Sequence, residues 1–212
     1  GPEGLRDIAH RIHAYAGYLA DQLVAMGYKQ LNDNFFDTLY IELPESLSAE
    51  KLREIALDCQ VNLRYYEDGR HVGISIDETT LESDLSVLLY IFSQLQGKDG
   101  DIEGTEVDDT KVYFDKKFAR QSDFLQYETF QKYHSETELM RYIKRLDRKD
   151  ISLAQSMISL GSCTMKLNAA SEVAQLSNPQ FAYIHPYAPD DQVEGYLEMI
   201  RNLSALLCEI TG

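Results

Sequence analysis

Residues 61–76 read VNLRYYEDGRHVGISI, and this stretch decides the fold. Two runs rich in β-branched and aromatic residues, 61–66 and 71–76, flank a short polar turn. The Asp68-Gly69 step within the turn suits a tight connection, because glycine accepts the positive φ that such a turn requires. The stretch therefore predicts an antiparallel β-hairpin.

A helix and a further strand are predicted upstream of the hairpin. Apolar residues recur every three or four positions over 5–26, which indicates an amphipathic helix, and Gly27 is well placed to end it. Residues 36–43 are rich in aromatic and β-branched side chains, so they predict a strand that stops at Pro44.

Two more helices are predicted on either side of the hairpin. Ser48 is suited to cap a helix that runs to Asp58, since its hydroxyl can accept an unsatisfied backbone N–H. Thr79 or Thr80 can cap the next helix, whose apolar face runs over 81–95. A compact sheet covered by helices is the natural way to bury these apolar faces, so this part of the chain predicts a small α/β domain.

The sequence changes character after this domain. Residues 98–121 are acidic and contain glycines, which predicts a domain boundary. Ser135 and Glu138 have the spacing of a capping box, so a helix is predicted over 135–149. Residues 151–189 show little periodicity and predict an extended arm. An apolar stripe near the C-terminus predicts one more helix.

The charge balance argues against two classes of partner. The chain carries 35 acidic and 20 basic residues, a formal net charge of -15, which repels nucleic-acid phosphates and anionic lipid surfaces. Five basic residues interleave with apolar ones at helical spacing, which favours a solvated helix face: Arg141, Lys144, Arg145, Arg148 and Lys149. No apolar run is long enough to cross a bilayer. We therefore expect neither nucleic acid nor a membrane as a partner.

Metal and disulfide chemistry find little support in the sequence. Cys59, Cys163 and Cys208 are odd in number and far apart, so they form neither a disulfide framework nor a CxxC motif. His10 and His13 lie one helical turn apart, but no acidic or cysteine partner at ligand spacing completes a zinc site. We expect no metal site and a reducing compartment.

Polar side chains are concentrated in residues 161–168, GSCTMKLN, after a glycine that can bring the backbone close to a ligand. Such a segment can hold a carboxylate or a phosphate through charge-assisted hydrogen bonds. The alternative is a loop whose polar groups satisfy one another. A reactive thiolate at Cys163 is unsupported, because neither a charged histidine nor a helix N-terminus can be placed beside it.

A second polar cluster lies in residues 185–189, HPYAP. It places the imidazole of His185 and the phenol of Tyr187 in a stretch that two prolines stiffen. A lone histidine is more often structural than catalytic, so the cluster by itself leaves both readings open.

The same segments carry a family resemblance. Residues 156–168, SMISLGSCTMKLN, followed by 184–189, IHPYAP, are similar to the signature stretch of glycine decarboxylase, the P-protein of the glycine cleavage system. Residues 133–142, YHSETELMRY, resemble the segment just upstream in that family. The chain departs from the family at Ser159, where proline is usual, and at Tyr187, where phenylalanine is frequent.

The resemblance implies a protein of two related halves, each like a fold-type-I pyridoxal-phosphate enzyme, of which only the second holds the cofactor. This chain spans their junction. Residues 1–100 are expected to be the small α/β domain of the non-catalytic half, with an antiparallel-containing sheet covered by helices, like the C-terminal small domain of fold-type-I transferases. Residues 101–150 are expected to be the connector, and 151–212 the arm and first helix of the catalytic half.

In such an enzyme, pyridoxal phosphate supports decarboxylation of glycine, and the aminomethyl group passes to the lipoyl arm of H-protein. The resemblance places seven residues beside the substrate or cofactor: Ser162, Cys163, Thr164, Lys166, Asn168, His185 and Tyr187. The Schiff-base lysine is expected outside this chain, so Lys166 is not that lysine and no catalytic residue is assigned. By itself the chain is expected to bind no cofactor and to be inactive.

The resemblance also implies partners and a location. The partners are the rest of the glycine decarboxylase chain and the lipoylated H-protein, in a homodimer or heterotetramer. The location is the bacterial cytoplasm, or the mitochondrial matrix in a eukaryote, with a bacterium favoured. The competing hypothesis is a non-catalytic interaction or regulatory module that uses the small sheet domain and its acidic surface.

Overall fold

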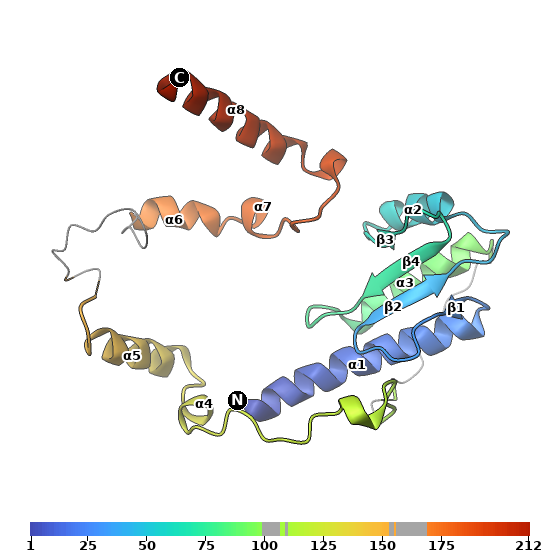
Figure 1. The fold of residues 1–212 in the computed structure, drawn as a ribbon, viewed down its shortest axis with the longest axis horizontal. Helices are drawn as coiled ribbons and strands as arrows, with labels where there is room; N and C mark the ends of the chain where they lie inside the picture. The colour runs from blue at the N-terminus through green and yellow to red at the C-terminus, as the bar shows by residue number, and fades with distance from the viewer. Residues whose placement is uncertain (99–106, 109, 153–154, 156–168) are drawn as a thin grey trace. The chain divides into compact units, whose positions relative to one another are not determined.

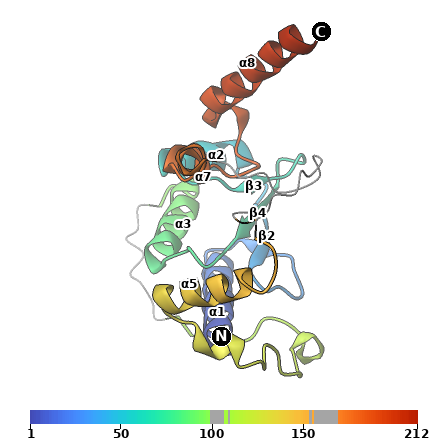
Figure 2. The same ribbon diagram turned by 90° about the vertical axis from the view of Figure 1, so that its left-hand side faces the viewer.

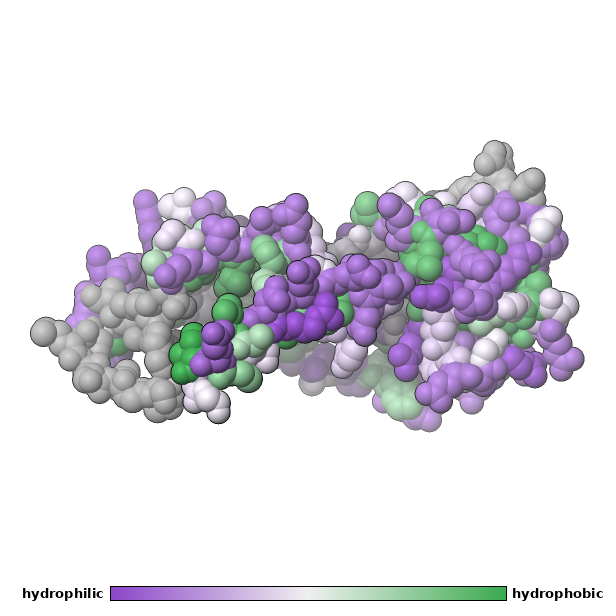
Figure 3. Space-filling view, turned by 90° about the horizontal axis from the view of Figure 1, so that it is seen from above, coloured by the Kyte–Doolittle hydropathy of each residue, from purple (hydrophilic) through white to green (hydrophobic). Residues whose placement is uncertain are grey.

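The computed structural model describes residues 1–98, 107–108, 110–152, 155 and 169–212 (Figure 1). The chain forms two units, Gly1–His134 and Ser135–Gly212. In the described part of the chain, no helix is long and apolar enough to cross a membrane. Exposed apolar residues lie among the hydrophilic ones on the surface in Figure 3.

The first unit contains a four-stranded antiparallel sheet with the strand order β1-β2-β4-β3. The strands are β1 Lys29–Gln30, β2 Thr38–Glu42, β3 Arg64–Tyr65 and β4 His71–Ser75. The sequence predicted β2 and β4 but not the two-residue strand β1, which has too few residues to show a period.

The predicted hairpin is present, formed by β3 and β4. Tyr65 pairs with Val72, and across the turn the Tyr66 N–H donates to the carbonyl oxygen of His71 at 3.1 Å. Gly69 takes a φ of 66°, as the turn requires. Strand β3 is shorter than the predicted 61–66, because Val61 donates its N–H to Ala56 at the end of the preceding helix instead.

Three helices cover one face of the sheet: α1 Pro2–Ala25, α2 Ala49–Asp58 and α3 Glu82–Leu95. Figure 2 shows α3 in a layer beside β2 and β4. The paired residues Leu39 and Ile74 are buried on the helix side, as are Ile41 and Val72, whereas Tyr40 between them lies half-buried on the other face. This alternation gives a two-layer α/β fold, as predicted.

The core lies between the sheet and these helices. Phe92 of α3 and Leu19 of α1 are fully buried in it. Tyr28 is buried beside them, and its hydroxyl donates to the carbonyl oxygen of Phe92 at 2.6 Å. Burial raises the pKa of the Tyr28 phenol to about 12.

The predicted helix ends are confirmed in two places and wrong in one. Ser48 caps α2, and Gly27 follows α1 with a φ of 94°. Neither Thr79 nor Thr80 caps α3, because both threonine hydroxyls bond to Asp77 in a preceding turn. The helix starts after Leu81 instead, as the next paragraph describes.

The start of α3 is closed by a side chain inside the helix. The carboxylate of Asp84 accepts the N–H of Leu81 at 2.8 Å, and the Asp84 N–H donates to the carbonyl oxygen of Leu81 at 3.0 Å. A carboxylate in the first turn also interacts favourably with the helix dipole.

The rest of the first unit follows α3. It contains a 3₁₀ helix, η1 Lys116–Phe118, and the short helix α4 Thr129–Lys132. Residues 111–115 lie against α1, where Tyr113 makes most of the contacts described below.

The second unit consists of helices: α5 Glu136–Asp147, α6 Ala170–Leu176, α7 Pro179–Ala182, η2 Asp190–Gln192 and α8 Glu194–Thr211. Ser135 caps α5 as predicted, accepting the Glu138 N–H at 3.3 Å. No described residue of this unit is buried.

The prediction of an extended arm over 151–189 is wrong for part of its described length. Residues 170–176 and 179–182 are helical. Good helix formers such as Ala, Glu, Gln and Leu fill the first of these helices. The side chain of Asn178 caps the second, and Pro179 occupies its first position, where its missing N–H costs nothing.

Candidate functional site

Five of the seven predicted site residues lie outside the described residues: Ser162, Cys163, Thr164, Lys166 and Asn168. The other two, His185 and Tyr187, fall in the turn between α7 and η2. The structure therefore places one end of the predicted site.

The turn at 185–188 brings His185 and Tyr187 together. The Ala188 N–H donates to the carbonyl oxygen of His185 at 3.0 Å, and the Tyr187 N–H donates to its Nδ1, also at 3.0 Å. The two ring centroids are 5.9 Å apart. Because Nδ1 accepts, the neutral imidazole carries its proton on Nε2.

This arrangement leaves two proton donors on one turn. Nε2–H of His185 is one, and the phenol of Tyr187 is the other, with Tyr187 90 % exposed. Donors of this kind suit a carboxylate or phosphate group better than a cation. The turn fits the edge of a site for an anionic ligand.

A small pocket lies beside this turn, with a volume of about 380 Å³. It is formed by α7, Ile184 and the start of α8, and the rings of Phe181 and Tyr196 face each other across it with centroids 6.3 Å apart. Ile184 therefore joins the pocket to the His185 turn along the chain.

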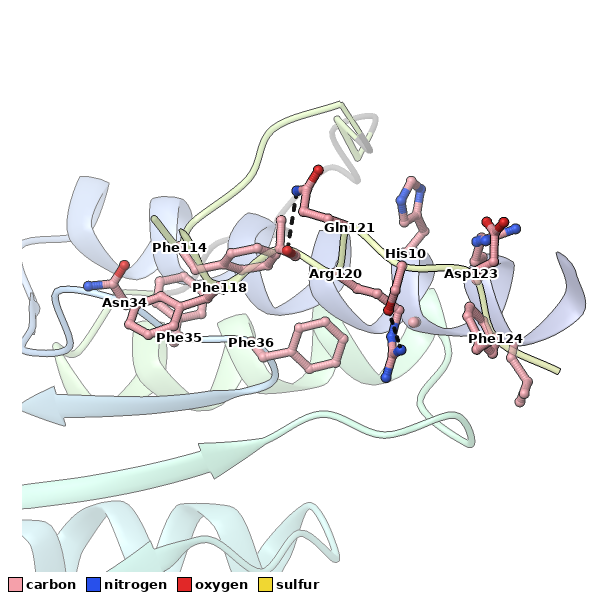
Figure 4. A pocket seen from close by; sticks show the side chains of 15 residues that line it. His10, Asn34, Phe35, Phe36, Phe114, Phe118, Arg120, Gln121, Asp123 and Phe124 are labelled. Carbon is pink, nitrogen blue, oxygen red and sulfur yellow. Dashed lines mark hydrogen bonds between the residues drawn. The ribbon is translucent and has the colours of Figure 1, made fainter. Parts of the chain in front are cut away.

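A larger pocket of about 750 Å³ lies in the first unit, between α1, the loop before β2 and residues 114–124 (Figure 4). Five phenylalanines line it: Phe35, Phe36, Phe114, Phe118 and Phe124. The sequence did not predict this pocket, because its walls come from three separate segments of the chain, residues 5–10, 34–36 and 114–124.

His13 of α1 links the loop before β2 to the segment around Tyr113 through hydrogen bonds. Its side chain is 6 % exposed, Nδ1 lies 2.7 Å from the carbonyl oxygen of Phe36, and Nε2 lies 3.0 Å from the backbone N of Tyr113. Since Nε2 accepts the Tyr113 N–H, the imidazole carries its proton on Nδ1 and donates to Phe36. Both nitrogens are used, so His13 is structural.

Tyr113 is anchored a second time through Asp21. The Asp21 carboxylate accepts from the Tyr113 hydroxyl at 2.7 Å and from Lys111 Nζ at 2.5 Å. Burial, followed by the bond to Asp21, raises the pKa of the Tyr113 phenol. The bond to Asp21 is the main reason that the pKa of Lys111 is raised too.

Gly17 makes room for the Tyr113 ring. A Cβ at this position would lie 2.0 Å from Cε2 of Tyr113, far inside contact distance. A glycine inside a helix otherwise lowers helix stability, so its presence in α1 was a signal of close approach that the sequence analysis passed over.

Metal ligands do not cluster in the described part of the chain, which has no group of three or more His, Cys, Asp or Glu that could hold a metal ion. Cys59 and Cys208 are free thiols.

Comparisons with known proteins decide the family. Residues 1–92 match the family model described as glycine cleavage system P-protein. Over its whole length the chain is 57 % identical to glycine dehydrogenase (decarboxylating) of Bacteroides thetaiotaomicron. The chain belongs to the glycine cleavage system P-protein family.

Further P-protein relatives agree with this assignment. The chain is 53 % identical to glycine dehydrogenase (decarboxylating) of Bacteroides fragilis and 45 % identical to the mitochondrial one of Gallus gallus, again over 100 % of its length. It spans 22 % of the length of the two Bacteroides proteins and 21 % of the Gallus gallus protein. The likeness to P-protein relatives thus includes residues 93–212, and with them both the large pocket and the His185 turn.

Proposed function

We propose that this chain is part of a pyridoxal-phosphate-dependent glycine decarboxylase that passes the aminomethyl group of glycine to the lipoyl arm of H-protein. The observation that carries the proposal is the 57 % identity over all 212 residues to a relative named glycine dehydrogenase (decarboxylating). When bound, pyridoxal phosphate supplies an electron sink for the decarboxylation.

In this proposal the residues of the arm line one edge of the cofactor and substrate site. The edge consists of Ser162, Cys163, Thr164, Lys166, Asn168, His185 and Tyr187. The geometry of the turn supports the last two, since the Nε2–H of His185 and the phenol of Tyr187 are available donors for an anionic group. Their task is to bind and orient a carboxylate or phosphate.

The remaining assignments divide the chain as the sequence suggested. Residues 1–100 are the small domain of the non-catalytic half, 101–150 the connector, and 151–212 the arm and first helix of the catalytic half. The Schiff-base lysine lies outside the chain, which is inactive alone and acts with the rest of the polypeptide and the lipoylated H-protein. The intact enzyme is a homodimer or heterotetramer of the bacterial cytoplasm or of the mitochondrial matrix.

Exposed apolar helix faces support the idea that these residues pack against more protein. On α8, Leu203, Leu206 and Ile210 are 57 %, 55 % and 78 % exposed. On α5, Met140 and Ile143 are 62 % and 53 % exposed. Removing apolar area of this extent from water lowers the free energy.

A chimera tests the proposal. The matching stretch of the Bacteroides thetaiotaomicron relative is replaced by this chain, and glycine-dependent release of carbon dioxide is measured with lipoylated H-protein present. The expected result is retained activity. A chimera that folds and binds pyridoxal phosphate but releases no carbon dioxide would show that the chain cannot serve as this part of the enzyme.

The isolated chain provides a second test. Titration with pyridoxal phosphate is expected to give no new visible absorption band that responds to glycine. A glycine-responsive band would mean that one of the chain's own lysines anchors the cofactor, which contradicts the placement of the chain within the enzyme.

A further inference from the structure

The large pocket of the first unit leaves much apolar surface in contact with water. Leu5, Phe36 and Phe118, which line it, are 50 %, 44 % and 63 % exposed. Its volume of about 750 Å³ falls within the range of sites that hold small organic molecules, roughly 300–1,000 Å³. An apolar molecule bound here would cover these side chains, and their removal from water would favour binding.

Two positive charges meet at one aromatic ring of this pocket. The guanidinium carbon of Arg6 lies 5.0 Å from the ring centroid of Phe124, and that of Arg120 lies 5.2 Å from the same centroid. Figure 4 shows the Arg120 side chain reaching between Phe36 and Phe124. Both guanidiniums therefore lie against the same ring at the edge of the pocket.

No carboxylate in the described part of the chain pairs with either guanidinium. Arg120 donates to the hydroxyl of Ser122 at 3.3 Å, a neutral group, and the Arg6 guanidinium lies against the Phe124 ring. Asp123 also lines the pocket but forms no ion pair with either arginine.

We propose that this pocket binds a small apolar carboxylic acid, with its carboxylate between Arg6 and Arg120 and its aromatic or branched body against Phe36 and Phe118. The carboxylate would accept charge-assisted hydrogen bonds from the guanidiniums. The cation–π contact with Phe124 favours these positions of the two guanidiniums, and their N–H groups can donate to the acid. This site is independent of the proposed glycine chemistry, because no residue is shared with the His185 turn.

The test is titration of the 212-residue chain with naphthalene-2-carboxylate, followed by isothermal titration calorimetry. We expect saturable binding that is at least tenfold weaker in the double variant Arg6→Gln, Arg120→Gln. The matched control is Arg141→Gln, Arg201→Gln, which removes the same charge from exposed helix positions and should bind as the wild type does. Asp123→Asn should bind more tightly, because it removes the one carboxylate that faces the ligand.

Two further outcomes keep the proposal falsifiable if the arginine variants fold poorly. On the wild-type chain, the neutral analogue 2-naphthamide should bind at least tenfold more weakly than the acid. Equal binding of acid and amide, or equal loss in both double variants, would overturn the proposal. So would tighter binding of the blocked dipeptide acetyl-Glu-Phe-amide than of the free acid, since the occupant would then be a polypeptide.

Discussion

The backbone N–H of Tyr113 donates to Nε2 of His13 at 3.0 Å, across 100 residues of chain. The other ring nitrogen of His13 lies 2.7 Å from the carbonyl oxygen of Phe36. One buried imidazole therefore joins α1, the loop before β2 and the segment after α3. The wall of the large pocket formed by residues 114–124 depends on this junction.

Replacing His13 with phenylalanine should destabilise the first unit by about 1–3 kcal/mol. The new ring keeps most of the packing but leaves the Phe36 carbonyl and the Tyr113 N–H without their partner, and each unsatisfied buried group costs free energy. Urea unfolding followed by circular dichroism measures the change. His10→Phe, at an exposed position one turn earlier, is the control and should stay within about 0.5 kcal/mol of the wild type. Equal effects of the two substitutions would refute the structural role of His13.

Gly17→Ala should destabilise the protein even though alanine is the better helix former. The added methyl would meet the Tyr113 ring at 2.0 Å, so the ring and the residues around it must move, at a cost of about 1–3 kcal/mol. Trypsin should then cut faster after Lys111, Lys116 and Lys117. Gly4→Ala has open space at its Cβ and should be neutral or stabilising by up to about 1 kcal/mol. Unchanged cleavage in Gly17→Ala would show that the ring does not need this space.

The Asp68 carboxylate should make the hairpin turn sensitive to acid. The Arg70 N–H, and next the His71 side chain, donate to it and hold its pKa below the ordinary value of 3.8. A pKa lowered by folding contributes stability that is present above the unfolded pKa and is lost as the pH falls through the folded pKa. The difference in unfolding free energy between the wild type and Asp68→Asn should therefore shrink between about pH 5 and pH 2.

Glu67→Gln is the control for that experiment, because it removes a carboxylate from the same turn without touching these hydrogen bonds. Its difference from the wild type should vary less over the same pH range. If Asp68→Asn shows no more pH dependence than Glu67→Gln, the hydrogen bonds to Asp68 contribute nothing to stability.

Two substitutions in the first turn of α3 separate the contribution of a hydrogen bond from that of a negative charge. Asp84→Ala should cost about 0.5–2 kcal/mol, because Leu81 loses the acceptor for its N–H and the first turn loses a favourable charge. Glu82→Ala removes a first-turn carboxylate without removing this bond and should cost less. Thermal unfolding measures both. A larger loss in Glu82→Ala would mean that charge alone matters at this helix end.

This helix end also shows what sequence patterns can and cannot predict. Ser48 and Gly27 act on their own neighbours, so local chemistry was enough to place those helix ends. Before α3, the hydroxyls of Thr79 and Thr80 bond to Asp77 in a turn instead of capping the helix. The sequence pattern is compatible with both arrangements and does not show which one is more stable. In the first unit, apolar periodicity predicted α1, α2, α3 and the two longer strands, because it reports which face is buried.

The contacts that shape the large pocket could not be predicted from the sequence, for a different reason. His13 reads as one more residue of an amphipathic helix, and Tyr113 lies in a stretch whose acidic composition indicated only a boundary. Nothing local connects residues 100 positions apart. Of the candidate site, the residue types at 185 and 187 were identified from the sequence, whereas the bond that sets the tautomer of His185 required the structure.

The tautomer of His185 leads to a prediction about catalysis in the chimera with the Bacteroides thetaiotaomicron relative. If His185 has the role proposed above, His185→Ala should lower kcat/KM for glycine at least tenfold, because the Nε2–H donor is lost. Tyr187→Phe should also lower kcat/KM, because it removes the phenol donor while the ring and the backbone turn both remain. His185→Asn decides between binding and folding roles: its side-chain oxygen can still accept the Tyr187 N–H and keep the turn, but it has no donor at the Nε2 position. If asparagine restores the activity that alanine loses, His185 only shapes the turn. If both variants are equally impaired while their pyridoxal phosphate content stays normal, the imidazole contacts the reacting ligands.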